Sequence, residues 1–73
     1  MTTRARIRIR MNDGERDVPE GQALAGLLDE MGLAGRQGMA VAVNAKVVPR
    51  ADWALRLLAD GDQVLVIQAS QGG

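Results

Sequence analysis

Residues 4–14 read RARIRIRMNDG, and their alternation establishes the class of fold. Apolar side chains and arginines take turns from Arg4 to Met11, a period of two that is typical of a strand with one buried face. Asn12-Asp13-Gly14 then predicts a hairpin turn, with Asp-Gly as the short-range signal. A second strand is expected at about residues 15–18, and we expect the arginines to form a solvated face of the sheet.

An amphipathic helix is expected next, from about residue 22 to residue 31. Long apolar side chains recur at i, i+3, i+4 and i+7, which marks one face of a helix. The four side chains are Leu24, Leu27, Leu28 and Met31. Gly32 is placed to end the helix in the left-handed conformation. Gly26, inside the helix, costs about 1 kcal/mol relative to alanine, which suggests a close backbone contact or a weak helix.

Three further strands are expected in the second half of the chain. Apolar runs predict them at residues 39–43, 46–48 and 64–67. Asn44-Ala45 is the expected turn between the first two, and Pro49 prevents extension of the second. The run at 64–67 is apolar on both faces, which is typical of a central strand covered on one side by the helix.

Between the last two strands, residues 51–58 can form one or two helical turns. Trp53, Leu57 and Leu58 are expected to face the core, and a tight turn at residues 60–62 leads into the last strand. The order of elements predicts an α+β fold, a mixed sheet of about five strands with one main helix across one face. If the first and last strands pair in the middle of the sheet, they must be parallel.

The composition describes one small domain over residues 1–73. The chain is 47% apolar and has no cysteine, histidine or tyrosine, so a disulfide or a Cys/His metal site cannot form and the usual nucleophiles and general bases are absent. We therefore expect no enzyme activity, no metal and no bound cofactor. Nine basic and nine acidic residues balance, which gives no reason to expect nucleic acid. No apolar run suits a membrane span or signal peptide, so a cytoplasmic location is expected.

The sequence ends in Gln71-Gly72-Gly73, where the C-terminal carboxylate is the one reactive group that the chain can present freely. A glycine pair removes side chains and frees the backbone to thread into a narrow site. Residues 69–73 follow the last apolar alternation without a large side chain as an anchor, so we expect a flexible tail there. These features suggest a carrier whose working group is its own C-terminus.

The second half of the chain resembles the ThiS-type sulfur carriers, small members of the ubiquitin-like β-grasp fold. The segments that carry the resemblance are Val43-Asn44, Val47-Val48-Pro49-Arg50, Trp53-Ala54, residues 58–64 (LADGDQV) and Gln71-Gly72-Gly73. The match is good from about residue 40 onward, while the first forty residues agree in pattern more than in letters. Ala45 departs from the family, in which an Asn-Gly turn is usual at this place.

The resemblance implies a cycle that depends on partners. An E1-like adenylating enzyme would use ATP and Mg²⁺ to convert the Gly73 carboxylate to an acyl-adenylate, with Gln71, Gly72 and Gly73 in its channel. Sulfur from a cysteine-persulfide donor would displace AMP and leave a thiocarboxylate. Thiazole synthase would then take this sulfur for the thiazole ring of thiamin. The candidate partner contacts are Arg50, Trp53, Asp60 and Asp62.

Other functions remain open at this point. A molybdopterin-type sulfur carrier would share the fold, the Gly-Gly end and the activation step, although the segment from Pro49 to Trp53 favours thiamin. A ubiquitin-like modifier would join Gly73 to lysines of other proteins, and a plain interaction module would leave the tail inert. The fate of the C-terminus, as thiocarboxylate, isopeptide or unchanged carboxylate, distinguishes these functions.

Overall fold

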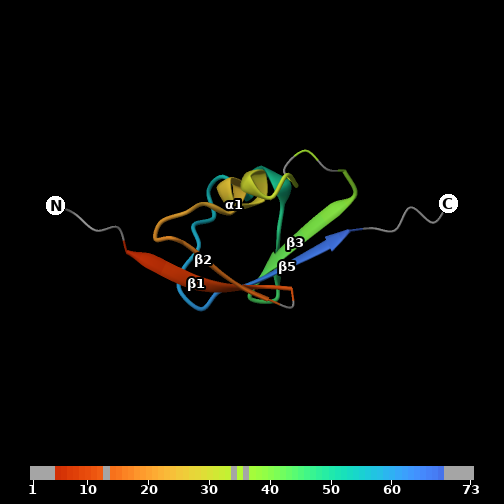
Figure 1. Ribbon diagram of the computed structural model, residues 1–73. Helices are drawn as coiled ribbons and strands as arrows, with labels where there is room; N and C mark the ends of the chain where they lie inside the picture. Colours follow the sequence, from red (N-terminus) through yellow and green to blue (C-terminus); the bar gives the residue numbers. More distant parts are fainter. Residues whose placement is uncertain (1–4, 13, 34, 36, 69–73) are drawn as a thin grey trace.

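The computed structural model describes residues 5–12, 14–33, 35 and 37–68. Within these residues a five-stranded sheet carries one α-helix across one face (Figure 1). In chain order the elements are β1 (Arg6–Met11), β2 (Gly14–Pro19), α1 (Leu24–Glu30), β3 (Met39–Val43), β4 (Lys46–Val48), the short 3₁₀ helix η1 (Arg50–Asp52) and β5 (Gln63–Gln68). The predicted α+β fold, with a mixed sheet and one main helix, is confirmed.

β5 is the last strand of the sequence, and it lies in the centre of the sheet. The strand order is β2-β1-β5-β3-β4. β5 runs parallel to β1, with Met11 beside Val64, and antiparallel to β3, with Met39 beside Gln68. Parallel neighbours need a long crossover connection, which α1, β3 and β4 supply. The predicted parallel pairing of the first and last strands is therefore confirmed.

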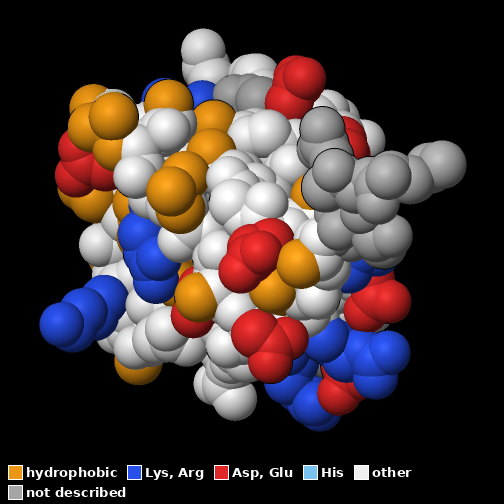
Figure 2. Space-filling model, turned by 90° about the vertical axis from the view of Figure 1, so that its left-hand side faces the viewer, with side chains coloured by type: hydrophobic (Ala, Val, Ile, Leu, Met, Phe, Trp, Pro, Cys, Tyr) orange, Lys and Arg blue, Asp and Glu red, His pale blue; other side chains and the backbone are white. Residues whose placement is uncertain are grey.

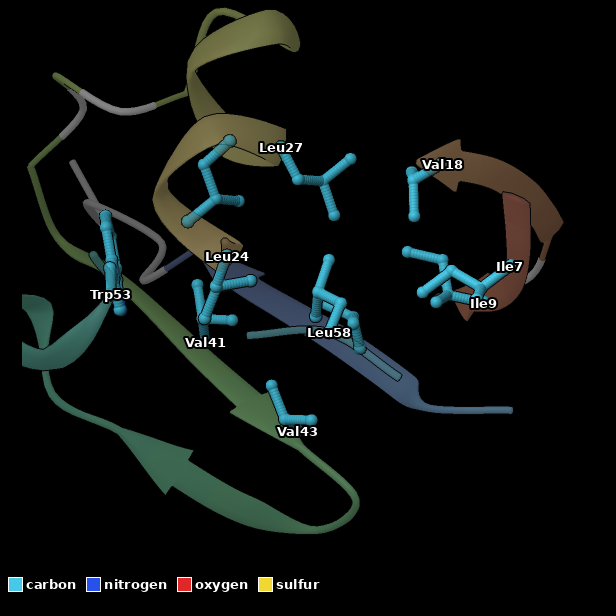
Figure 3. Packing of buried hydrophobic residues seen from close by; sticks show 11 residues of the cluster. Ile7, Ile9, Val18, Leu24, Leu27, Val41, Val43, Trp53 and Leu58 are labelled. Atoms are coloured by element: carbon cyan, nitrogen blue, oxygen red, sulfur yellow. The ribbon is translucent and has the colours of Figure 1, made fainter. Parts of the chain in front are cut away.

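The hydrophobic core lies between α1 and the inner face of the sheet (Figure 3). The three leucines of α1, Leu24, Leu27 and Leu28, are completely buried. The strand and loop side chains packed with them are Ile7, Ile9, Val18, Val41, Val43, Trp53, Leu58 and Val64. Burying one such aliphatic side chain stabilises a fold by about 1.5–3 kcal/mol, so this layer is the main source of stability. Within the described residues, no helix is long and apolar enough to cross a lipid bilayer.

α1 is shorter than predicted, and Met31 does not belong to its buried face. The helix ends at Glu30, and Gly32 adopts the predicted left-handed conformation with a φ of 75°. Met31 is the C-cap, one position past the last helical residue, and its side chain is exposed. Of the two alternatives for Gly26, a close backbone contact or a weak helix, the close backbone contact is not found. A Cβ at that position would meet only the flexible side chain of Gln22.

Leu57 faces solvent, so the prediction that it joins the core is wrong. Of the helix predicted for residues 51–58, only η1 and a following turn form, and Leu57 makes an isolated β-bridge with Ala23. Neighbouring side chains of extended backbone point to opposite sides. Leu58 is consequently buried, whereas Leu57 is 55% exposed. Trp53 is buried as predicted.

Both hairpin turns use residues with positive φ. The register of β1 and β2 leaves Asn12-Asp13 as the loop, one residue earlier than the Asp-Gly signal indicates; Asp13 itself lies outside the described residues. In the β3–β4 hairpin, Asn44 has a φ of 53° and Ala45 a φ of 71°, as a type I′ turn requires. Asparagine visits this region readily but alanine does not. Ala45 is therefore a strained position.

Candidate functional site

The candidate site is built around the end of β5. Figure 1 shows β5 lying beside β3. Its final residue, Gln68, pairs with Met39 of β3 and is the last described residue. The tail predicted for residues 69–73 lies outside the described residues, as do the predicted site residues Gln71, Gly72 and Gly73. The surroundings of Gln68 are therefore described from the strands and loops that lie beside the end of β5.

An apolar surface lies over β3, β4 and β5 on the outer face of the sheet, on the side opposite α1. Direct cross-strand partners lie on the same face of a sheet, and Leu65 pairs with Ala42 while Ile67 pairs with Ala40. Val47 of β4 joins them as the second partner of Ala42. We call these five residues the apolar sheet face. Leu65 and Ile67 are 47% and 48% exposed, which is typical of a contact surface rather than of a solvated strand.

The outer face over β1 and β2 is charged. The arginines of β1 point away from the core and meet the carboxylates of β2: Arg8 lies 3.1 Å from Asp17 and 3.6 Å from Glu15, and Arg10 lies 3.7 Å from Glu15. Figure 2 shows blue and red side chains interleaved at the lower right. The hydrogen bond that Arg8 Nε donates to Asp17, with the nearby negative charges, raises the pKa of Arg8 above its ordinary value. Exposed pairs of this kind contribute at most about 1 kcal/mol each. The predicted solvated face is confirmed for Arg6, Arg8 and Arg10, which are exposed, whereas Arg4 lies outside the described residues.

A pocket opens beside the end of β5, and Arg50 lies on its rim. Its lining residues are Gly35, Gln37, Gly38, Met39, Ala40, Arg50 and Ile67. The Arg50 guanidinium carbon lies 4.6 Å from the ring centroid of Trp53, a cation–π distance. Trp53 is buried and donates from Nε1 to the carbonyl oxygen of Val48 at 2.9 Å. Trp53 thus holds Arg50 in place, and Arg50 is the one of the two that faces outward.

Asp60 and Asp62 lie at the opposite end of β5 from the C-terminal exit. The Asp62 side chain accepts hydrogen bonds from Nδ2 of Asn44 at 2.9 Å and from the Ala59 amide at 2.8 Å, and only 6% of the residue is exposed. Asp60 accepts from the backbone N–H of Arg8 at 2.8 Å. These carboxylates hold the turn that starts β5, so the predicted site residues fall into two groups at the two ends of one strand.

Asn12 is a residue of the site that sequence reasoning missed, since it was assigned only to the turn. Its Oδ1 accepts a hydrogen bond from the Val66 amide at 2.8 Å, and its Nδ2 donates to the Val66 carbonyl at 3.3 Å. Its own backbone N–H donates to the Val64 carbonyl at 3.0 Å. The only signal in the sequence is an amide side chain directly after the alternating run.

The described part of the chain defines a small ubiquitin-like β-grasp domain, in which the central strand ends beside an apolar surface. A sequence profile of the ThiS family matches residues 4–73. The sulfur carrier protein ThiS of Escherichia coli strain K12 is 40% identical over 68 residues, which cover 92% of this chain and all of that protein. This chain belongs to the ThiS family.

A solved structure supports the fold. The thiamine biosynthesis protein ThiS from Geobacter metallireducens superposes with a TM-score of 0.78 at 23% sequence identity. The superposition covers 92% of this chain and all of that one. The predicted β-grasp topology, with the C-terminal strand in the centre of the sheet, is thereby confirmed.

Proposed function

We propose that this chain carries sulfur for thiamine biosynthesis as a thiocarboxylate on Gly73. The observation that supports this most strongly is the relationship to the E. coli sulfur carrier along that protein's whole length. The geometry is consistent with it, because the central strand ends beside an exposed apolar surface and Gly73 follows five residues after Gln68 in the sequence. The chain acts as carrier and co-substrate, and its partners carry out the catalysis.

The proposed chemistry starts from the Gly73 carboxylate, which is ionised at neutral pH. An adenylating enzyme with ATP and Mg²⁺ joins a carboxylate oxygen to the α-phosphorus, and pyrophosphate leaves. The terminal sulfur of a cysteine persulfide then attacks the acyl carbon and AMP leaves. Reduction of the remaining S–S bond by a thiol releases the thiocarboxylate. Thiazole synthase is the proposed acceptor of this sulfur.

We infer that the apolar sheet face and Arg50 dock the partners that act on the tail. Exposed apolar side chains that gather in one place commonly mark protein–protein contacts, and arginine is enriched in such contacts. Both features lie next to the last described residue, so a partner bound there has the C-terminus within reach. Five extended residues span roughly 17 Å. Trp53 serves this surface by holding Arg50, whereas Asp60 and Asp62 serve it only by anchoring β5.

The decisive experiment follows the C-terminus by intact mass spectrometry. Wild type, a variant lacking Gly73 and Gly72→Leu are incubated with the adenylating enzyme of the thiamine pathway, ATP and a cysteine-persulfide donor. Wild type is expected to exchange one oxygen for sulfur, and both variants are expected to remain unchanged because the carboxylate is displaced or its channel is blocked. Thermal stability should be unaffected in both variants, since they remove no core packing.

Gly14→Leu is the matched control, because a Cβ at Gly14 meets no atom within 4 Å and its φ is not positive. This variant should gain sulfur as wild type does. Sulfuration of the variant lacking Gly73 at the wild-type rate would contradict the proposal. If wild type is recovered linked to lysines of other proteins, the modifier function replaces it.

A further inference from the structure

The two edges of β5 are unequally supported. On one edge, β3 accompanies β5 along its whole length to Gln68. On the other edge, the backbone pairing with β1 stops at Met11, which lies beside Val64. Among the described residues, no strand continues along this edge beyond Val64. Beyond Val64, the backbone N–H and C=O groups on this edge of β5 therefore have no neighbouring strand in the described part of the chain to bond to.

The side chain of Asn12 occupies this position. Starting with the residue just before β5, alternate residues turn their backbone groups toward β1: Asp62 accepts from Arg10, and Val64 accepts from Asn12. Val66 is the next residue in this series, and its N–H and C=O are both bonded by the Asn12 amide. One primary amide thus supplies both of the hydrogen bonds that Val66 would receive from two residues of β1 if that strand continued. It extends the pairing on this edge by two residues of β5.

We propose that Asn12 is a positioning residue, which holds the end of β5 in line and thereby directs the Gly73 carboxylate into the partner's active site. This inference rests on the proposed function. Because Asn12 bonds both backbone groups of Val66 on this edge and β3 pairs with β5 on the other, the end of β5 is supported on both edges. Once the partner's channel holds the tail extended, a tilt of about 10° at that point moves the end of a five-residue extension, roughly 17 Å long, by about 3 Å. Displacements of about 1 Å reduce reaction rates by about two orders of magnitude.

Asn12 can fill this role because its backbone can adopt the turn conformation while its side-chain amide bonds Val66. A φ of 45° turns the chain back into β2 while the side chain continues in the direction of β1. Asparagine tolerates positive φ better than other residues with side chains. Two substitutions separate these contributions: Asn12→Gly keeps the backbone conformation and removes the amide, and Asn12→Asp keeps an acceptor for the Val66 N–H and loses the donor.

The first measurement needs no partner. Amide hydrogen exchange is followed by NMR in wild type, Asn12→Gly and Asn12→Asp. Exchange at Val66 should accelerate at least tenfold in Asn12→Gly and remain close to wild type in Asn12→Asp. Exchange at Ile67 should change little in either variant, because its amide faces β3 rather than Asn12. Unchanged exchange at Val66 in Asn12→Gly would show that the Asn12 amide does not protect the Val66 N–H, and would overturn the inference.

The second measurement separates positioning from folding. Pyrophosphate release by the thiamine-pathway adenylating enzyme is measured against the concentration of each carrier. Asn12→Gly should lower kcat about tenfold or more with KM within twofold of wild type, because docking through the apolar sheet face is intact. Asn12→Asp should recover most of the loss. A general loss of folded protein would instead raise the apparent KM.

The outcomes distinguish the two proposals. Wild-type kcat in Asn12→Gly, with accelerated exchange at Val66, means that the amide stabilises the strand without directing the tail, and overturns the inference while the proposed function stands. If wild type itself releases no pyrophosphate and gains no sulfur, the proposed function fails and the positioning role fails with it.

Discussion

Replacing Ala45 by glycine should stabilise this protein, although it removes a methyl group and adds backbone freedom. Ala45 has a φ of 71°, in the region that L-residues with a Cβ disfavour. The turn cannot relax into another type, because Asn44 is held by its neighbours. Its N–H donates to the Gln63 carbonyl at 2.8 Å, and its Oδ1 accepts from the Gln63 N–H at 3.0 Å. The strain is therefore present in the folded state and absent from the unfolded chain.

The expected magnitude is the difference of two opposing contributions. A left-handed conformation costs a residue with a Cβ about 1–2 kcal/mol, and glycine removes this cost. Glycine also makes the unfolded chain more flexible, which destabilises the fold by about 0.4–1 kcal/mol. The net effect is an increase in the free energy of unfolding of about 0.8 kcal/mol. For a domain of this size, it corresponds to a rise in Tm of roughly 3–6 °C.

Urea denaturation and differential scanning calorimetry measure this change directly. Ala51→Gly is the matched control, because Ala51 is exposed in η1 and has no positive φ. The same chemical change should there destabilise the protein by about 0.4–1 kcal/mol. Opposite signs at the two positions are the signature of strain at Ala45. A destabilisation by Ala45→Gly equal to that by Ala51→Gly would refute the reasoning.

Two further predictions test the ends of β5. Asp62→Asn should lower the free energy of unfolding by about 1–3 kcal/mol in urea denaturation, because an amide has one acceptor oxygen where the carboxylate uses two. The control is Asp29→Asn at an exposed position, whose free energy of unfolding should stay within about 0.5 kcal/mol of wild type. Equal effects of the two substitutions would contradict the structural role of Asp62. Leu65→Asp should weaken binding to the adenylating enzyme at least tenfold, or about 1.4 kcal/mol by calorimetry, with little change in stability. Leu57→Asp is its control, since Leu57 is also exposed but lies outside the apolar sheet face, and equal loss from both would argue against that face as the docking surface.

Much of the fold could be predicted because its signals are local. The alternation before Met11 identifies β1 and its two faces, the leucine spacing identifies the buried side of α1, and Met39–Val43 and Lys46–Val48 are strands with the predicted bounds. Periodicity succeeds here because side-chain direction follows from backbone geometry within a few residues. The same local reasoning is wrong for Met31 and Leu57, where the neighbouring chain decides the outcome. Gly32 is left-handed directly after Met31, and pairing with Ala23 sets an extended course for residue 57.

The candidate site divides in the same way. The sequence by itself identifies the Gly-Gly end, the apolar last strand and the resemblance to sulfur carriers, because each is carried by residues adjacent in the chain. Only the tertiary structure shows that Leu65 and Ile67 share one exposed face with β3 and β4, and that Asp62 is buried in a hydrogen-bonded turn. It alone brings Asn12 to Val66, 54 residues later in the sequence. No local pattern can encode such a contact, because it depends on which strands lie side by side, and burial of the core settles that arrangement for the whole chain at once.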